Sequence, residues 1–223
     1  MMNGVFLTLE GPEGSGKSSH TAALAAALRA QGREVVCVRE PGGTAVGEAV
    51  RAILQHNAAG EAPCPETETL LYAASRAQLV RCAIRPALQR GCCVIADRFL
   101  DSSMAYQGYG RGFGVDRVLA ANELAVDGAM PDLTLLLDVP ADVGLARIRR
   151  RNRERGAAPD RMEREDAAFH GRVRQGYLEL ARRWPERIRV IDSTPPFDAV
   201  CAAIRAAVEP LLKARKEAGD AGG

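Results

Sequence analysis

Long apolar runs are missing from the sequence, and this excludes a membrane-spanning protein. No stretch approaches the roughly 18–20 consecutive apolar residues that a transmembrane helix needs. Residues 5–9 already have the composition of a β-strand, which leaves no room for a signal peptide before them. We therefore expect a cytoplasmic protein with no membrane contact.

Cysteine pairs and a strong net charge are also missing. None of the six cysteines belongs to a C-x-x-C pair, which argues against a disulfide framework or a cysteine-rich metal site. Cys37, Cys92 and Cys93 lie in apolar runs, so we expect buried, reduced thiols at these positions. A formal net charge of +2 is too small to indicate nucleic-acid binding by bulk electrostatics.

No Pro/Gly/Ser-rich linker divides the 223 residues into two apolar halves. A chain of this length fits one α/β domain, which we place at residues 1–216. Residues 217–223 are small and polar, and we expect them to form a disordered tail.

Short apolar runs alternate with helix-forming stretches along the chain. The runs predict β-strands at residues 5–9, 34–38, 92–96, 133–139 and 188–191. They are nearly continuous in apolar residues, which is typical of strands buried on both faces of a parallel sheet. The stretches between them predict helices at residues 18–31, 44–55, 66–90 with an interruption at Pro86, 116–127, 141–155, 163–183 and 196–216. This alternation predicts a doubly wound α/β sheet that binds ligands outside the carboxyl ends of its strands.

One segment carries a specific chemical motif. Residues 11–18 read G-P-E-G-S-G-K-S and match the phosphate-loop pattern G-x-x-x-x-G-K-[ST] in full. Backbone N–H groups of such a loop converge on an anion, Lys17 reaches the β- and γ-phosphates, and the Ser18 hydroxyl coordinates Mg²⁺. The motif follows a predicted strand and opens a predicted helix, which is its confirming context. The expected ATP-binding residues are Gly11, Pro12, Glu13, Gly14, Ser15, Gly16, Lys17, Ser18 and Ser19.

A phosphate loop does not by itself name a reaction, because switches, motors and kinases share it. The chain has no N-K-x-D segment to read guanine, which disfavours a GTPase switch. Asp97 follows the third predicted strand and can hold the shell of Mg²⁺ through water. The neighbouring Arg98 can clamp an acceptor phosphate with its two-pronged guanidinium.

Six segments occur in the order and spacing of one enzyme family. They read EGPEGSGKSS, REPGGT, LLYAASRAQL, DRFLDSSMAYQGYGRG, PDLTLLLDV and DRMERED. By these motifs the chain resembles the thymidylate kinases from residue 7 to about residue 212. The resemblance implies the three-layer fold of the P-loop nucleoside monophosphate kinases, with a central parallel sheet of about five strands. It also implies transfer of the γ-phosphate of ATP to dTMP to give dTDP, Mg²⁺ as cofactor, and a homodimer.

The resemblance further implies how the acceptor is held at its phosphate and sugar. Arg51 and Arg98 match arginines that grip the dTMP phosphate. Glu13 matches an acidic residue that contacts the 3′-hydroxyl of the deoxyribose, and Tyr106 matches a tyrosine that crowds the 2′ position. The acceptor site also includes Arg39 in the REPGGT segment.

At the base, the resemblance places Pro41 in the wall of the ring pocket. Tyr72 stands where the family usually has a phenylalanine that stacks on thymine, and the tyrosine keeps a flat π-face. Arg76 matches an arginine that hydrogen-bonds near O4 of thymine. Ser103 and Gln107 match polar residues that read the edge of the base.

Arginines crowd residues 147–164, which we expect to form a mobile lid. A lid can bring cations over the migrating phosphoryl group while it excludes water. The phosphate loop contains no arginine, so the resemblance places the chain in the subtype whose lid supplies this charge. The candidate catalytic residues are Lys17, Arg98, Arg151, Arg153 and Arg161. Two alternatives stay open, namely a kinase for another pyrimidine monophosphate such as UMP or CMP, and a P-loop nucleotide switch without kinase activity.

Overall fold

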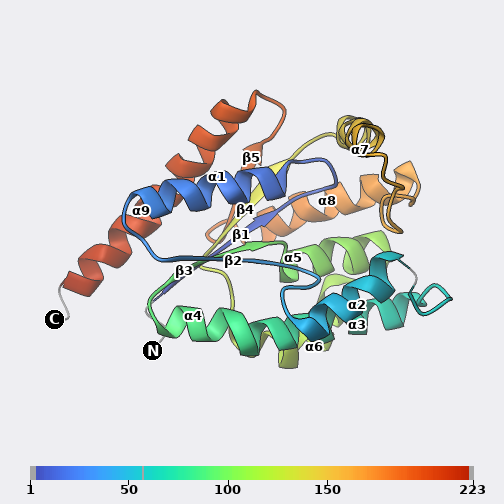
Figure 1. The fold of residues 1–223 in the computed structure, drawn as a ribbon, viewed down its shortest axis with the longest axis horizontal. Helices are drawn as coiled ribbons and strands as arrows, with labels where there is room; N and C mark the ends of the chain where they lie inside the picture. Colours follow the sequence, from blue (N-terminus) through green and yellow to red (C-terminus); the bar gives the residue numbers. More distant parts are fainter. Residues whose placement is uncertain (1–3, 57, 221–223) are drawn as a thin grey trace.

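Five parallel strands form the centre of the fold in a computed structural model of the chain, which describes residues 4–56 and 58–220 (Figure 1). Their order across the sheet is β2-β3-β1-β4-β5, and every neighbouring pair is parallel. The strands are β1 (Val5–Glu10), β2 (Val35–Arg39), β3 (Cys93–Asp97), β4 (Leu133–Asp138) and β5 (Ile188–Asp192). The predicted parallel sheet of about five strands is therefore confirmed.

Burial separates the three central strands from the two edge strands. β1 is buried along its whole length, and β3 and β4 are buried except at their last residue. β2 and β5 each have a neighbour on one side only, and several of their side chains reach solvent. The prediction that all five strands are buried on both faces is wrong for these two. Cys37 on β2 is accordingly exposed, whereas Cys92 and Cys93 are buried as expected.

Helices cover both faces of the sheet and give the fold three layers (Figure 1). On one face, α1 (Lys17–Ala30) and α9 (Phe197–Asp220) pack on alternate side chains of the central strands, including Leu7 and Leu135. The opposite face of β1 presents Phe6 to a second apolar core, to which a different set of helices contributes. These helices include α3 (Pro65–Leu79), α4 (Arg85–Gln89), α6 (Val115–Val126) and α8 (Ala167–Arg183). Helix α2 (Ala45–His56) packs against α3.

The structure contains two π-helical segments that the sequence does not predict. One divides a predicted helix, and the other lies where no element is predicted. The predicted helix at 66–90 is divided into α3, a π-helical segment η1 (Val80–Ile84) and α4. Pro86 lies in the first turn of α4, where a missing N–H is tolerated. A short helix α5 (Leu100–Ser103) continues into η2 (Met104–Gly110), for which no element is predicted. Such π-helical insertions are frequent at functional sites.

The chain leaves β4 into α7 (Ala141–Arg155), and residues 156–166 then lead to α8. Helix α8 begins later than predicted because Asp166 caps it, accepting a hydrogen bond from the Phe169 backbone N–H at 2.6 Å. Helix α9 continues to Asp220, into the segment predicted to be a disordered tail, and residues 221–223 lie outside the described part of the chain. Within residues 4–56 and 58–220, no helix combines the length and apolarity needed to cross a membrane.

Candidate functional site

A cleft of about 630 Å³ opens where the chain leaves the carboxyl ends of β1, β2 and β3. Its walls come from the phosphate loop, from the segments after β2 and β3, from α3 and η2, and from α7 with the loop that follows it. This is the edge of a parallel sheet at which doubly wound folds bind ligands. Most of the residues proposed from the sequence line this cleft. Those outside the lining are Gly11, Pro12 and Ser15 of the phosphate loop and three arginines, Arg76, Arg153 and Arg161.

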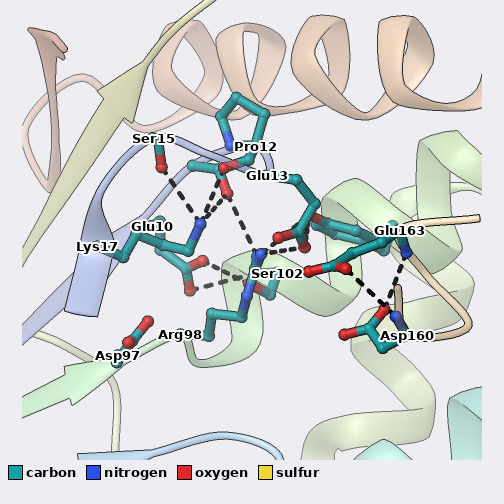
Figure 2. A network of polar contacts seen from close by, with 12 residues as sticks. Glu10, Pro12, Glu13, Ser15, Lys17, Asp97, Arg98, Ser102, Asp160 and Glu163 are labelled. Atoms are coloured by element: carbon teal, nitrogen blue, oxygen red, sulfur yellow. Dashed lines mark hydrogen bonds and ion pairs between the residues drawn. The ribbon is translucent and has the colours of Figure 1, made fainter. Parts of the chain in front are cut away.

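The phosphate loop surrounds the amino group of Lys17, which hydrogen-bonds to several of its oxygens (Figure 2). Lys17 Nζ donates hydrogen bonds to the backbone oxygens of Gly11 at 3.0 Å and Pro12 at 2.9 Å, and to Ser15 Oγ at 3.2 Å. Gly14 and Gly16 have φ values of 74° and 84°, a left-handed conformation that favours glycine. Because α1 begins at Lys17, its amino-terminal N–H groups face the same space, which suits an anion.

The phosphate loop and α7 approach each other closely at two glycines, Gly14 and Gly144. A Cβ on Gly14 would lie 2.2 Å from the backbone oxygen of Gly144 in α7. A Cβ on Gly144 would lie 2.2 Å from the backbone oxygen of Glu13. Neither position accommodates a side chain without moving the backbone, so the position of α7 is coupled to that of the loop. Gly144 belongs to no motif, so nothing in the sequence singles it out.

Two oxygen ligands suited to a hard cation lie side by side at the end of β3. Ser18 Oγ donates to Asp97 Oδ2 at 2.5 Å, although 79 residues separate the two positions in the sequence. Mg²⁺ is commonly bound through one or two protein oxygens together with substrate phosphates and water. The hydroxyl and carboxylate therefore fit the metal that the phosphate-loop motif implies.

Arg98 joins the phosphate loop to the far wall of the cleft. Its Nη2 lies 2.5 Å from Glu13 Oε1 (Figure 2). The same nitrogen lies 3.1 Å from the Tyr106 hydroxyl. Its Nη1 donates to Gly11 O at 3.3 Å, to Ser102 Oγ at 3.1 Å and to the Tyr177 hydroxyl. The guanidinium is thus held by groups from the phosphate loop, α5, η2 and α8.

The charge of this ion pair is strongly stabilised. Burial alone would raise the pKa of Glu13, but the neighbouring Arg98 and Lys17 cations outweigh it and lower the pKa to about 2. For Arg98, burial disfavours the cation, yet Glu13 and the surrounding oxygens raise its pKa well above the usual value. Both groups are therefore charged at neutral pH.

The backbone at Arg98 is in a left-handed conformation, with φ of 70°, which a non-glycine residue adopts at a cost of about 1–2 kcal/mol. Two hydrogen bonds hold it there. Arg98 N–H donates to Leu9 O at 3.1 Å, and the next N–H, of Phe99, donates to Glu10 Oε1 at 2.7 Å. The strained turn directs the guanidinium to the phosphate loop.

Glu10 supports this turn from within the core. Its Oε2 accepts hydrogen bonds from Ser102 Oγ at 2.6 Å and from the Tyr177 hydroxyl at 3.0 Å. Complete burial, and then the nearby Asp101, raise the pKa of Glu10 to about 7 despite these hydrogen bonds. The sequence shows a carboxylate at the end of a predicted buried strand. Its hydrogen-bond partners are distant in the sequence, so they could not be predicted.

The acceptor side of the cleft is lined by Pro41, Tyr72 and the predicted polar residues of α5 and η2. Arg51 Nη1 donates to Pro41 O at 3.0 Å, so this hydrogen bond holds the Arg51 guanidinium beside the REPGGT segment. Ser103 is 2% exposed, and its hydroxyl has no hydrogen-bond partner among the described residues, although the side chain borders the cleft. The remaining predicted acceptor residues in the lining are Glu13, Arg39, Arg98, Tyr106 and Gln107.

Arg76 does not line the cleft. It is 1% exposed, and its Nε and Nη2 donate to Glu40 Oε2 at 2.9 and 2.5 Å. Its Nη1 is bound to Asn122, and Nη2 also donates to Phe99 O at 3.1 Å. With its guanidinium engaged in this way, Arg76 ties α3 to the segment before Pro41. Direct contact between Arg76 and a base stays a prediction that the geometry does not support.

The lid arginines divide into two groups. Those that border the cleft are Arg147, Arg150, Arg151 and Arg155. Arg151 Nη2 pairs with Glu163 Oε1 at 2.5 Å, which connects α7 to the loop after it. Arg153 is exposed and outside the lining. Arg161 turns toward α2, where its Nε donates to Leu54 O at 2.8 Å. Of the three proposed lid residues, only Arg151 reaches the cleft.

Arg147 was not singled out in the sequence from its neighbours in the arginine run. Its Nη1 donates to Ser193 O at 3.0 Å and lies 3.4 Å from Gly14 O, so it spans from the lid helix to the loop after β5. Ser193 Oγ in turn donates to Ser15 O at 2.7 Å. This strip forms the end of the cleft next to the phosphate loop.

Comparison with known proteins gives consistent matches. The family model described as thymidylate kinase matches residues 9–204. The thymidylate kinase of Methylococcus capsulatus is 50% identical over 212 residues, which cover 95% of this chain and 98% of that protein. That of Deinococcus radiodurans is 49% identical over 208 residues, covering 93% and 98%. A crystal structure of thymidylate kinase from Ehrlichia chaffeensis matches with a TM-score of 0.73 at 32% identity, covering 92% of this chain and 98% of that one.

The close approach of the two glycines predicts that Gly144→Ala pushes α7 away from the phosphate loop. We expect ATP to bind about tenfold or more weakly, since small displacements at such sites are costly. Titration with a fluorescent ATP analogue measures this. Gly171→Ala, in α8 with open space around it, is the matched control and should leave binding unchanged. Equal affinities for the two variants would contradict the coupling.

The raised pKa of Glu10 predicts a pH-dependent contribution to stability. Between pH 4.5 and about 7 the folded protein keeps a proton on Glu10 that the unfolded chain has lost. The free energy of unfolding should therefore fall, relative to Glu10→Gln, by up to about 1.4 kcal/mol per pH unit as the pH rises through this window. Urea unfolding of both proteins from pH 5 to 8 measures the difference. A difference that stays constant or grows with pH would show that Glu10 is ionised throughout.

Proposed function

The chain belongs to the thymidylate kinase family, and on this premise we propose that its cleft transfers the γ-phosphate of ATP to dTMP, releasing ADP and dTDP. The observation that carries the proposal is the ion pair between Arg98 and Glu13. It connects a phosphate loop for the donor to a pocket with aromatic and polar walls for the acceptor, within one cleft. A nucleotide switch needs no such second pocket, so the geometry favours a nucleoside monophosphate kinase.

On the donor side, the phosphate loop would bind the phosphates of ATP through its backbone N–H groups and Lys17. Burial, followed by the repulsion of Arg98, lowers the pKa of Lys17 to about 8. An anionic phosphate beside the amino group would stabilise its protonated form. Ser18 and, through water, Asp97 would hold Mg²⁺, which would supply positive charge to offset the charge that develops on the phosphates.

On the acceptor side, Arg51 and Arg98 would bind the phosphate of dTMP, and Arg39 lies at the same border of the cleft. Glu13 would accept a hydrogen bond from the 3′-hydroxyl. Tyr106, held by its hydrogen bond to Glu13 Oε1 at 2.8 Å, would crowd the 2′ position and disfavour ribonucleotides.

Around the base, Tyr72 would stack on thymine and Pro41 would form the opposite wall. Burial raises the pKa of Tyr72, so its added hydroxyl stays protonated and neutral. The unpaired hydroxyl of Ser103 and the amide of Gln107 would meet the edge of the base. Arg76 would act from behind this pocket by holding Glu40 next to Pro41.

The chemistry requires no protein nucleophile, because the acceptor phosphate is already an oxyanion. Catalysis then rests on in-line positioning and on cations around the transferred group. The lid is suited to supply these cations, since four of its arginines border the cleft while the phosphate loop has none. This supports the lid-arginine subtype, with Arg151 as the favoured catalytic residue among Arg151, Arg153 and Arg161.

We also propose that the protein is a cytoplasmic homodimer, as the family resemblance suggests. ATP and dTMP are cytoplasmic metabolites, which supports the location. Large apolar side chains on three adjacent helices support the dimer: Val46 on α2, Leu70 on α3 and Leu124 on α6 are 51%, 59% and 89% exposed. Burying such side chains against a second copy would remove apolar surface from water.

A panel of acceptors tests the proposed reaction. Coupled ADP release should be stimulated most by dTMP and much less by UMP or CMP. No stimulation by any monophosphate would leave a nucleotide switch as the function, and preference for UMP or CMP would assign a different kinase.

Arg98→Ala removes a charge-assisted contact to the acceptor phosphate, which is worth about 1.5–3 kcal/mol. We expect kcat/KM for dTMP to fall by about 10- to 150-fold while the Kd for ATP changes little. Arg182→Ala is the control, since this arginine is exposed on α8 and away from the cleft lining. An equal loss of ATP affinity in Arg98→Ala would mean that Arg98 serves the donor.

Arg151→Ala tests the lid. Removal of a cation that stabilises the transition state should lower kcat by about 10³-fold, with small changes in KM for either substrate. Arg153→Ala should reduce kcat far less, because that side chain lies outside the cleft. A larger loss in Arg153→Ala than in Arg151→Ala would show that the lid rearranges before catalysis.

A further inference from the structure

A buried carboxylate that the mechanism above does not use lies behind the acceptor pocket. Glu68 of α3 is fully buried. Its Oε1 accepts hydrogen bonds from Gln107 Nε2 at 2.8 Å and from Arg111 Nε at 3.2 Å, and its Oε2 accepts one from Arg111 Nη2 at 3.0 Å. Arg161 Nη2 lies 2.6 Å from the same Oε2 as an ion pair, without the alignment of a hydrogen bond. Arg111 thus bridges both oxygens of Glu68, while Gln107 is bound by Oε1 and Arg161 faces Oε2.

Glu68 is ionised in this environment. Burial by itself raises the pKa of a carboxyl group, but the hydrogen bonds from Arg111 and Gln107 and the charges of Arg111 and Arg161 lower the pKa of Glu68 overall. An ionised carboxylate can only accept hydrogen bonds. The amide of Gln107 must therefore turn its nitrogen toward Glu68, whichever way the amide would otherwise point.

This orientation determines what Gln107 offers a ligand. Gln107 borders the cleft, and no described residue donates a hydrogen bond to its side-chain oxygen Oε1. The group available to a base is hence a carbonyl, which is an acceptor. Thymine and uracil carry a donor, N3–H, on the edge where cytosine carries an acceptor, the bare N3. An acceptor in the protein matches the first two bases and opposes the third.

We propose that Glu68 is a specificity-determining positioning residue, which holds the Gln107 amide nitrogen so that the carbonyl selects bases with an N3–H and rejects cytosine. The inference rests on the proposed function, and it adds the reason why one pyrimidine class is preferred. It also accounts for Arg161, whose guanidinium is directed to Glu68 and away from the phosphate loop.

The lid takes part in this arrangement. Arg161 belongs to the loop of residues 156–166, and so does Glu165, whose Oε1 lies 2.5 Å from Arg111 Nη2. The two arginines keep Glu68 ionised, and Glu165 holds one of them in place. Base selection is therefore strongest when the lid loop is seated on α3 and η2.

Glu68→Gln tests the proposal by giving position 68 a hydrogen-bond donor as well as an acceptor. The new carbonyl would turn to Arg111 and Arg161, leaving its NH₂ group to face Gln107. The Gln107 amide would then rotate and present its own NH₂ to the cleft, which suits the N3 of cytosine. The quantities to measure are kcat/KM for dTMP and dUMP, and kcat/KM or the competitive inhibition constant for dCMP.

We expect the preference for dTMP over dCMP to fall by about tenfold or more, while the preference for dTMP over dUMP stays within about twofold. Thymine and uracil differ only in the 5-methyl group, so that second ratio reports on damage unrelated to N3. Glu66→Gln, on the exposed side of the same helix, is the matched control and should change neither ratio. A proportional loss for all three monophosphates would overturn the proposal and assign Glu68 a purely structural role.

Gln107→Leu completes the cycle and does not depend on the folding of the Glu68 variant. This change alone should lower the preference for dTMP over dCMP, and adding Glu68→Gln should lower it no further. An unchanged preference in Gln107→Leu, or an equal additional effect of Glu68→Gln in that background, would overturn the proposal. A wild-type protein without dTMP turnover would instead refute the proposed kinase function, so the two failures are distinguishable.

Discussion

The arrangement of the cleft depends on one cation, Arg98, which is held in a strained backbone conformation at the carboxyl end of β3. Its guanidinium pairs with Glu13 inside the phosphate loop and also touches oxygens from β1's loop, α5, η2 and α8. The strain is offset by Glu10, which binds the next backbone N–H, and by Leu9. Because the phosphate loop and the acceptor wall both contact this group, Arg98 sets the position of the acceptor wall relative to the loop.

Three buried or half-buried carboxylates serve this cleft in different protonation states. Glu13 is firmly ionised because two cations face it, and Glu68 is ionised because two arginines face it. Glu10 has hydroxyl and N–H partners, but its complete burial, and then a neighbouring acid, raise its pKa to about 7. The same side chain thus anchors an ion pair, orients an amide or supports a turn, depending on whether cations or neutral donors surround it.

Much of the fold and part of the site follow from local sequence patterns. The central strands are predictable because β1, β3 and β4 are continuous apolar runs, and the phosphate loop because its residues are adjacent in sequence. Edge position is a tertiary property, so the exposure of Cys37 on β2 was mispredicted. The η2 segment has no regular period, and the partners of Arg76, Arg161 and Glu68 lie on other elements. Motif resemblance could select Arg76 and Arg161 but could not say whether they face the cleft, and it did not select Glu68.

The central claim is that donor and acceptor sites are one continuous cleft joined at Arg98. A titration with a bisubstrate analogue, in which adenosine and thymidine are linked through five phosphates, tests it most directly. We expect one analogue bound per chain, displaced competitively by ATP alone and also by dTMP alone. An analogue that ATP displaces and dTMP does not, or that binds two independent places on each chain, would contradict it.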